Sequence, residues 1–243
     1  MEYDSFSKVG VDADLVAYSC SFATQEKTKG DLHNAIDELI GYVISSTVVF
    51  AGEGNVSGYL TGSDNFRFDV AKAYPYKGNR KETEKPRWLN DSREYMQDKY
   101  GFVVTIGCET DDKLAEEATS YYDPDAYVIA SLDKDMFTIP GYKFNWRKGT
   151  FEYSTKHDAL KFFYTQLLTG DTADNIVGLY RVGPRKAEKI LDGALSEVEM
   201  YTRVLKAYSE SPTLVGDPEE RIVENGRLLH LCRYEGEVWK PPI

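Results

Sequence analysis

The sequence predicts an α/β fold: a central, mostly parallel sheet flanked by helices, with a smaller helical subdomain at the C-terminal end. Short apolar runs alternate with stretches of helical spacing through the first two thirds of the chain, which is typical of a parallel sheet covered by helices. The last third, from residue 184 onward, has mainly helical spacing. We therefore expect an α/β domain at 1–165 and a helical subdomain at 166–243.

The individual elements follow from local patterns of apolar residues and from turn and capping residues. The expected strands are residues 8–12, 56–61, 101–106, 126–131 and 142–146. The expected helices are residues 31–46 with Asp31 as N-cap, 111–121, 157–168, and most of the chain from 184 to a tail at 226–239. Residues 80–99 are polar and mixed in charge, so we expect an exposed helix or a mobile loop there.

Composition places the protein among ordinary globular proteins, because 42% of its 243 residues are hydrophobic and 28% are charged. No apolar run reaches the roughly 18 residues of a membrane span, and the first residues lack the features of a signal peptide. The three cysteines are far apart and match neither a zinc site nor a disulfide framework. These observations predict a protein of the reducing cytoplasm that has no membrane partner.

The net charge of −11 by itself argues against a nucleic-acid partner, because binding phosphate requires Lys and Arg. The charge is unevenly distributed, however. Residues 72–99 contain eight basic and five acidic residues, and residues 181–189 contain four basic and one acidic residue. Residues 196–224 contain seven acidic and three basic residues. The sequence therefore predicts two local basic patches on an acidic body, and solvated helix faces are the simpler interpretation of such patches.

Acidic residues follow the predicted strands at the points where the strands end. The candidates are Asp12, Glu109, Asp111, Asp112, Asp133 and Asp135, with Asp171 and Asp174 just after a helix. Ligands of open α/β sheets bind beyond the carboxyl ends of the strands, so we expect these carboxylates to converge at one edge. Each pair alone could instead stabilise a helix start or a polar turn; the shared position at strand ends favours a site.

A cluster of this kind needs cations, because crowded carboxylates raise one another's pKa and destabilise the fold. Carboxylate oxygens suit Mg²⁺ or Mn²⁺, and the lack of clustered Cys and His disfavours zinc. Two such ions can ionise a bound water and stabilise a leaving oxygen. The acids therefore predict the hydrolysis of phosphodiester bonds.

Several motifs, in one order along almost the whole chain, resemble those of the phage and bacterial 5′-to-3′ exonucleases and flap endonucleases. This family includes the 5′ nuclease domain of bacterial DNA polymerase I, and the chain most resembles its small phage-encoded members. The motifs are Val11-Asp12 with Tyr18, Tyr76–Arg80 (YKGNR), Glu109–Asp112 (ETDD), Ser131–Asp135 (SLDKD), Gly170–Ile176 (GDTADNI) and Gly178–Ala187 (GLYRVGPRKA). Any one of these motifs alone is a weak signal, whereas their common order is specific.

The resemblance implies a catalytic centre with two divalent ions, Mg²⁺ or Mn²⁺. The first ion would be held by Asp12, Glu109, Asp111 and Asp112, and the second by Asp133, Asp135, Asp171 and Asp174. Lys77 and Arg80 would act on the scissile phosphate, and Tyr76 would stack on the terminal base. The segment near 76–100 would be a flexible arch through which a single-stranded 5′ end passes.

The resemblance also implies a DNA grip of the helix-hairpin-helix type near residues 176–190, which positions duplex phosphates without reading sequence. The implied DNA-binding residues are Tyr76, Lys81, Arg181, Gly183, Arg185, Lys186 and Lys189. K⁺ is a candidate ion at this hairpin. The implied partner is DNA with a 5′ end, whether duplex, gapped or flapped, with RNA/DNA hybrids as a further candidate. A monomer is expected, in the host cytoplasm if the protein is phage-encoded.

Two positions depart from the family pattern. Arg181 stands where the hairpin usually has a glycine, which suggests an altered turn. Gly62 stands where the family has an acid after the second strand, and Asp64 is the nearest substitute, so we expect Asp64 to join the metal ligands. The alternative is that Asp64 caps the segment after it or lies in solvent.

The leading functional hypothesis is an active 5′ nuclease that removes primers or resects ends in DNA replication or recombination. A catalytically impaired, structure-specific DNA-binding protein is the first alternative, and Gly62 favours it. A PIN-like ribonuclease is the second alternative. The GDTADNI motif and the hairpin after it disfavour the ribonuclease, because they indicate binding to DNA duplexes.

Overall fold

The structure, a computed structural model, describes residues 6–47, 55–80, 84–121 and 123–242. Its chain forms two compact units. Unit 1 comprises Met1–Asn65, Glu84–Ser154 and Cys232–Glu235, and unit 2 comprises Phe66–Thr83, Thr155–Leu231 and Gly236–Ile243. These units differ from the expected ranges 1–165 and 166–243, because residues 66–83 and 155–165 belong to the unit of the C-terminal helices.

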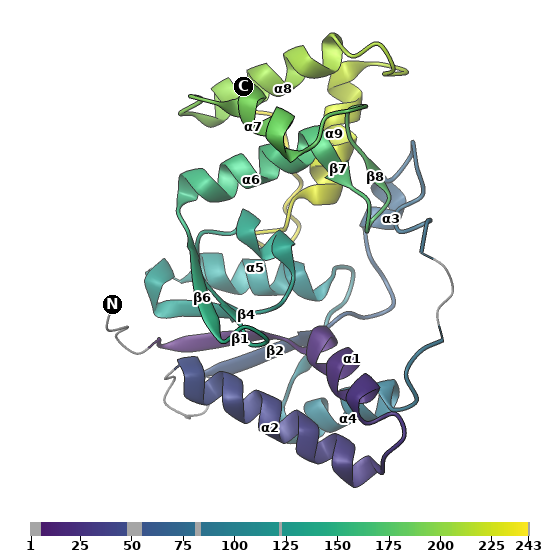
Figure 1. The fold of residues 1–243 in the computed structure, drawn as a ribbon, viewed down its shortest axis with the longest axis vertical. Coiled ribbons are helices and arrows are strands. Elements are labelled where there is room, and N and C mark those ends of the chain that lie inside the picture. The colour runs from purple at the N-terminus through teal and green to yellow at the C-terminus, as the bar shows by residue number, and fades with distance from the viewer. Residues whose placement is uncertain (1–5, 48–54, 81–83, 122, 243) are drawn as a thin grey trace. The chain divides into compact units, whose positions relative to one another are not determined.

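Unit 1 is built on a six-stranded sheet with the order β3-β2-β1-β4-β5-β6 (Figure 1). Its strands are β1 Lys8–Asp12, β2 Val56–Leu60, β3 Val103–Val104, β4 Tyr127–Ala130, β5 Gly141–Asn145 and β6 Thr150–Ser154. All neighbouring strands are parallel except β5 and β6, which pair antiparallel. The predicted α/β class and mostly parallel sheet are confirmed, and β6 is an addition to the predicted strands.

The sheet reverses its order between β1 and β4, at the centre of unit 1. Strand β1 pairs with β2 on one side and with β4 on the other, so that Val9 lies opposite both Val56 and Val128. The side chains of Val9 and Val11 are fully buried because helices cover both faces of the sheet. Open α/β sheets bind ligands at the carboxyl ends of the strands beside such a reversal, and this place at the ends of β1 and β4 is called the crevice below.

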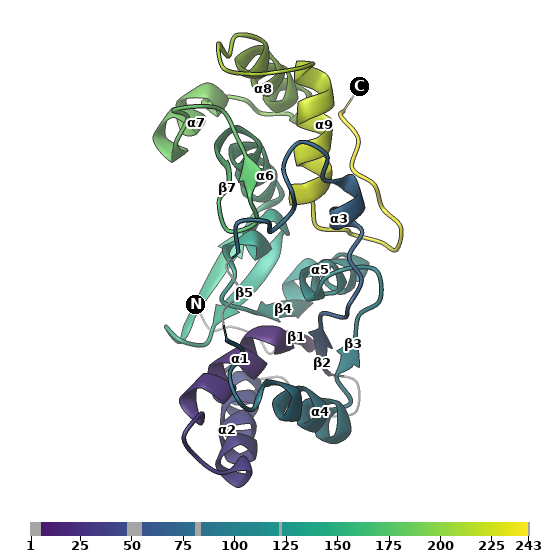
Figure 2. The same ribbon diagram turned by 90° about the vertical axis from the view of Figure 1, so that its right-hand side faces the viewer.

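Helices cover both faces of this sheet (Figures 1 and 2). They are α1 Ala13–Ala23, α2 Lys29–Thr47, α4 Leu89–Tyr100 and α5 Thr110–Ser120, with short 3-10 turns η1 Pro124–Ala126 and η2 Lys134–Thr138. Helices α1, α2 and α4 pack together on one face, and α5 covers the other face against β1, β2 and β4. Helix α5 buries Leu114, Ala115 and Ala118.

Three local expectations for unit 1 need correction. Helix α1 was not expected, although Asp12 before it is an N-cap whose carboxylate accepts from Leu15 N at 3.1 Å. Helix α2 begins at Lys29, so Asp31 is not its N-cap; its carboxylate accepts instead from the N–H and hydroxyl of Thr28. The stretch 80–99 is not wholly exposed, because α4 buries Leu89, Ser92 and Met96 against α1 and α2.

Unit 2 packs helices around a second core. Its elements are α3 Arg67–Val70, α6 Lys156–Thr169, β7 Gly170–Asp171, β8 Ile176–Val177, α7 Pro184–Leu191, α8 Glu197–Ser209 and α9 Pro218–Leu229. Residues of α6 form the centre of the core, including the fully buried Tyr164 and Leu167. The helical character predicted for the last third is confirmed, and helix α9 extends four residues into the predicted tail.

The segment 66–83 is held in unit 2 by a buried arginine. Arg67 is 1% exposed, and its guanidinium donates to the carbonyls of Leu228 at 2.9 Å and His230 at 2.8 Å. These bonds compensate for burying the charge at the end of α9. Within the described ranges, no helix combines the length and apolar character needed to cross a bilayer.

Candidate functional site

Two acidic residues meet where β1 and β4 end. The Ser131 hydroxyl donates to Asp12 Oδ2 at 2.8 Å and accepts from Asp133 N at 3.0 Å, so one serine connects both strand ends. Asp12 is 3% exposed. Asp133 in turn caps η2 by accepting from Asp135 N at 2.9 Å. The predicted convergence of Asp12 and Asp133 at the crevice is thus present, and the bond from Ser131 explains how the two strand ends are held together.

The start of α5 brings three further carboxylates toward the same place. Burial raises the pKa of Asp111 most, and the negative charges of Asp12, Asp133, Glu109 and Asp112 add to the rise. Asp112 is fully buried; its Oδ2 accepts from Glu109 N at 3.1 Å and its Oδ1 from Cys232 N at 3.0 Å. These bonds support the interpretation of Asp112 as an acid that stabilises the helix start. Its binding to metal stays a prediction.

Burial and crowding raise the pKa values of two of these carboxylates. Burial, with the nearby charges of Asp14 and Asp133, raises the pKa of Asp12 to about 7, although hydrogen bonds from Ser131 and Leu15 oppose the rise. Burial is also the largest cause that raises the pKa of Asp111 well above its usual range. Without a cation, burial and neighbouring charge therefore disfavour the ionised form of both groups. A divalent ion would favour the ionised form, so the electrostatics of the group fit a cation.

The side chains around Asp12 and Asp111 offer carboxylate oxygens, which are the donors that Mg²⁺ and Mn²⁺ prefer. Among the described residues, no three His, Cys, Asp or Glu side chains already stand in the arrangement of a formed metal site. The residues present nevertheless fit hard divalent cations, because their donor atoms are negatively charged carboxylate oxygens.

Two predicted ligands of unit 1 show no sign of such a role. Asp135 forms an ion pair with Lys134, at 2.7 Å between Oδ1 and Nζ. Asp64 is exposed, and helix α3 begins after Phe66 without a side-chain cap, so Asp64 neither points into protein nor caps this helix. The structure thus favours the solvent-exposed alternative for Asp64.

Two distant motifs meet in unit 2, where residues 76–80 pack against residues 170–175. The Tyr76 hydroxyl donates to Asp174 Oδ2 at 2.8 Å, and Lys77 N donates to Asp174 O at 2.9 Å. Arg80 Nη2 lies 2.6 Å from Asp174 Oδ1, and Asn79 Nδ2 lies 2.5 Å from Thr172 O. The YKGNR and GDTADNI motifs therefore form one structural element.

This element changes the predicted role of Tyr76. The ring is only 4% exposed and lies edge-on to Phe68 at 5.5 Å between centroids, within the core of unit 2. A ring buried in this way cannot stack on a DNA base, so Tyr76 is a packing residue here. Lys77 is held with a left-handed backbone (φ 55°), and its ammonium lies 3.9 Å from Asp174 Oδ1. Asp174 thus binds cationic side chains, and its predicted role as a metal ligand stays a prediction, as does that of Asp171.

The segment expected to form the hairpin has a left-handed residue at Arg181. This residue adopts φ 57°, a region that glycine enters freely and other residues enter at a cost, and its guanidinium lies over the Tyr180 ring at 5.1 Å. Gly178 is required nearby, because a Cβ there would lie 2.3 Å from Gly170 N. Arg181 therefore adopts a backbone conformation that glycine enters more easily.

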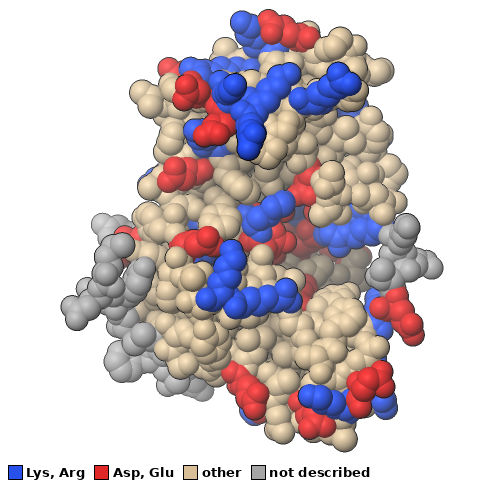
Figure 3. Space-filling view, in the orientation of Figure 1, with Lys and Arg blue, Asp and Glu red and all other residues tan. Residues whose placement is uncertain are grey.

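A basic surface follows this turn. Arg181, Gly183, Arg185, Lys186 and Lys189 are all exposed, and α7 starts at Pro184 directly after Gly183. In Figure 3, blue Lys and Arg atoms gather over this part of unit 2. Lys81 lies outside the described residues. The predicted basic patch at 181–189 is thus a continuous exposed surface beside a helix N-terminus.

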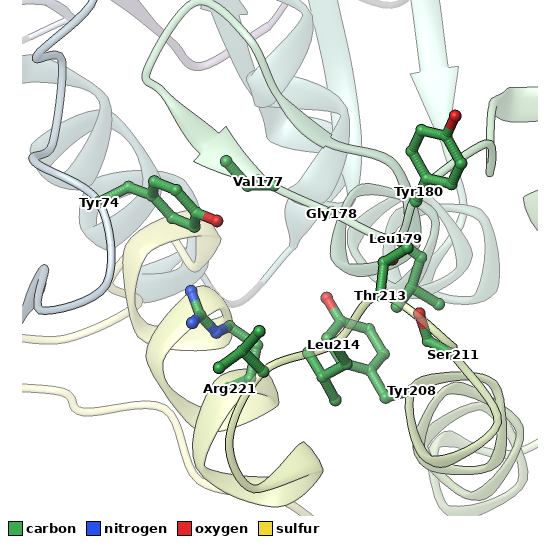
Figure 4. A pocket seen from close by; sticks show the side chains of 11 residues that line it. Tyr74, Val177, Gly178, Leu179, Tyr180, Tyr208, Ser211, Thr213, Leu214 and Arg221 are labelled. Carbon is green, nitrogen blue, oxygen red and sulfur yellow. The ribbon is translucent and has the colours of Figure 1, made fainter.

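A pocket of about 270 Å³ in unit 2 is lined in part by residues 177–180 (Figure 4). Tyr74 and Arg221 line one side, with the guanidinium 5.4 Å from the ring centroid, and Tyr208 closes its floor. The first turn of α9 next to Arg221 carries Glu219 and Glu220. The negative charges of these acids disfavour a phosphate ligand beside Arg221.

Comparisons with known proteins agree with this architecture. An exodeoxyribonuclease of Enterobacteria phage T3 is 26% identical over 207 residues, covering 72% of this chain and 67% of the phage protein. The D15 protein of phage T5, co-crystallised with metal ions, has a TM-score of 0.66 at 19% identity, covering 92% of this chain and 89% of that one.

A second structure of phage T5 D15, a flap endonuclease in a pseudo-enzyme-product complex with DNA and metal ions, matches with a TM-score of 0.59 at 20% identity and covers 91% of this chain and 85% of that one. No protein-family model matches the chain. The chain therefore has the fold of the phage 5′ nucleases and is similar in sequence to a phage exodeoxyribonuclease.

Proposed function

We propose that this protein is a metal-dependent 5′ nuclease that hydrolyses DNA phosphodiester bonds as an exonuclease or flap endonuclease. The observation that carries the proposal is the crowding of carboxylates at the reversal of the sheet. Burial and neighbouring charge raise the pKa of Asp12 and of Asp111, and a bound cation would oppose that rise. Because like charges repel, such crowding destabilises the fold, and it is typical of functional sites.

The proposed metal ligands are first of all Asp12, Glu109, Asp111 and Asp133, whose charges act on one another at the crevice. When bound, divalent ions would ionise a water molecule and stabilise the leaving oxygen of the phosphodiester. Mg²⁺ or Mn²⁺, two per site, agrees with the carboxylate donors. The serine bridge from Ser131 would fix Asp12 and Asp133 for this task. K⁺ at the hairpin stays a prediction.

The proposed substrate is DNA with a 5′ end. The exposed cations Arg181, Arg185, Lys186 and Lys189, with the N-terminus of α7, form the surface that suits duplex phosphates. Lys77 and Arg80 are proposed to bind the scissile phosphate; DNA phosphate would compete with Asp174 for them. The same proposal includes action on RNA/DNA hybrids, a monomeric state, a cytoplasmic location, and a role in primer removal or end resection.

A catalytically impaired DNA-binding protein is the second candidate, and Gly62 is the observation that favours it. A Cβ at this position would lie 2.1 Å from the Thr105 carbonyl oxygen, so the chain has no room for the acid of the family pattern. The remaining carboxylates of the crevice favour an active enzyme.

A cleavage assay separates the two candidates. Purified protein is incubated with 5′-end-labelled nicked, gapped and flapped duplexes, with and without Mg²⁺, and the products are resolved by length. We expect metal-dependent release of short 5′ products, abolished by excess EDTA and by Asp133→Asn. Tight binding of flapped DNA without cleavage in Mg²⁺ or Mn²⁺ would favour the impaired protein. Cleavage in excess EDTA would contradict the metal site.

A further inference from the structure

Asp14, two residues after Asp12, bonds to three segments of unit 1. Its Oδ2 accepts from Thr61 N at 2.8 Å and from the Thr110 hydroxyl at 2.9 Å. Its Oδ1 lies 2.5 Å from Arg93 Nη1. Thr61 follows strand β2, Thr110 begins helix α5 and Arg93 lies on α4. One carboxylate thus ties the chain after β1 to β2, α4 and α5.

Arg93 completes this tie at the place where the family acid is missing. Its Nη2 donates to the Thr61 carbonyl at 2.7 Å, immediately before Gly62. The Thr61 hydroxyl also accepts from Thr110 N at 3.0 Å, which connects the end of β2 directly to the first turn of α5. Because Gly62 has no room for a side chain, Arg93 and Asp14 supply the polar contacts at the end of β2.

The carboxylates of the crevice are attached to the segments that this pair joins. Asp12 is separated from Asp14 by one residue, and Glu109, Asp111 and Asp112 flank Thr110. A fork-shaped guanidinium that bonds both a carboxylate and a carbonyl fixes direction as well as distance. Side chains of Asp14 and Arg93 are 22% and 23% exposed, so their ion pair is partly shielded from solvent.

We propose that Asp14 and Arg93 are positioning residues, whose ion pair sets the place of Asp12 relative to the start of α5 and thereby the spacing of the metal-binding carboxylates. This inference rests on the proposed function. The pair would act through Asp12 and the α5 acids without touching substrate. Misplacement of such groups by about 1 Å can cost on the order of a hundredfold in rate.

The competing explanation is that the pair acts only by charge, with Arg93 neutralising Asp14 beside the acids. Arg93→Lys separates the two explanations, because lysine keeps the positive charge but lacks the planar fork that bonds Asp14 and Thr61 together. Positioning predicts that this variant is impaired, whereas a charge effect predicts nearly normal behaviour. Asp14→Asn is the companion variant, since an amide cannot accept from all three partners.

Asp37→Asn is the matched control. Asp37 also accepts from a basic side chain of α4, with Lys99 Nζ at 2.6 Å, and from the Tyr95 and Tyr100 hydroxyls. Those bonds join α2 to α4 and involve none of the segments that carry the acids. The control therefore weakens the attachment of α4 while leaving the ends of β1 and β2 intact.

The experiment measures kcat and KM on a flapped duplex, Mn²⁺ binding to the DNA-free protein by calorimetry, and thermal unfolding. We expect Arg93→Lys and Asp14→Asn to lower kcat about tenfold to a hundredfold, with KM for DNA within about twofold, and both to weaken Mn²⁺ binding. Asp37→Asn should lose thermal stability with kcat and Mn²⁺ affinity near wild type.

Wild-type kcat and Mn²⁺ affinity in Arg93→Lys would overturn the inference, and so would an equal loss of kcat in Asp37→Asn. A wild-type protein that cleaves none of the substrates would overturn the proposed nuclease function instead. In that case the Mn²⁺ affinities of Arg93→Lys and Asp37→Asn still decide whether the pair positions the carboxylates.

Discussion

The Tyr76 hydroxyl donates a 2.8 Å hydrogen bond to Asp174 Oδ2, joining two motifs that lie 98 residues apart in the sequence. The same carboxylate pairs with Arg80, and the backbone of Asp174 accepts from Lys77. The basic residues proposed to bind the scissile phosphate are therefore held in place by an acid of another motif.

Tyr76→Phe should destabilise the protein without weakening DNA binding. The phenylalanine ring fills the same space, but Asp174 loses a donor, which costs about 1 kcal/mol for a hydrogen bond of this kind. Thermal unfolding and DNA affinity measured on the same preparation check this. If Tyr76 instead stacked on a DNA base, Tyr76→Phe would keep both stability and DNA binding. Tyr76→Ala would then lose DNA affinity because it lacks the stacking ring.

Lys77→Ala and Lys186→Ala should have opposite kinetic signatures. Lys77 is proposed to act on the reacting phosphate, so its loss should lower kcat far more than DNA affinity. Lys186 is exposed on α7 and proposed to bind duplex phosphate, so its loss should weaken binding and make the salt dependence shallower by about one unit of slope. Steady-state kinetics at several salt concentrations distinguish the two. Identical signatures would contradict the division of roles.

The stability of the metal-free protein should fall as pH rises from about 4 to 7. The folded-state pKa of Asp12 is raised to about 7 from 3.8, so the folded state holds a proton that the unfolded state releases. The stabilisation by the Asp12 proton is complete below pH 4. It falls by on the order of 1 kcal/mol per pH unit between pH 4 and pH 7. Urea unfolding in EDTA at several pH values measures it.

In the same series, Asp111→Asn should raise metal-free stability near pH 7, because it removes a carboxyl group whose ionised form is disfavoured in the folded state by burial and neighbouring charges. It should also abolish most cleavage in Mg²⁺. A marked loss of metal-free stability in Asp111→Asn would support the structural interpretation of this acid.

Gly62→Ala should destabilise the protein by about 1–3 kcal/mol, because the added methyl meets the Thr105 carbonyl oxygen at 2.1 Å. Gly41→Ala is the control; it lies in α2 with no atom within 4 Å of the new methyl, so it should be neutral or stabilising by up to about 1 kcal/mol. Chemical denaturation of both variants tests the difference. Equal stabilities would show that the chain at Gly62 can move aside.

Asp64→Asn should cleave DNA at close to the wild-type rate and need the same metal concentration. The side chain is exposed, so removing its charge changes little at the crevice. A Mg²⁺ titration of the cleavage rate provides the measurement. A loss of orders of magnitude, with a higher metal requirement, would restore Asp64 to the metal ligands.

The sequence alone determined the class of the fold and the convergence of acids at its centre. Strand positions such as 8–12 and 56–61 follow from apolar runs, and parallel strands place their carboxyl ends at one edge. Helix α1 was predictable from the Asp12 cap signal but follows its strand with no intervening loop, which hides the change of element. Helix α4 was missed as core because its few apolar residues give a weak periodic signal.

Only the tertiary structure decided which polar groups pair. The contacts of Asp14 with Arg93, and of Tyr76 with Asp174, join residues about 80 and 100 positions apart. Local periodicity carries no information about such partners, because hydrogen bonds depend on the three-dimensional distance of a few tenths of a nanometre. For the same reason Asp64, plausible as a ligand by its place in the sequence, proves to be exposed, whereas Asp14 is the acid bonded beside the end of β2.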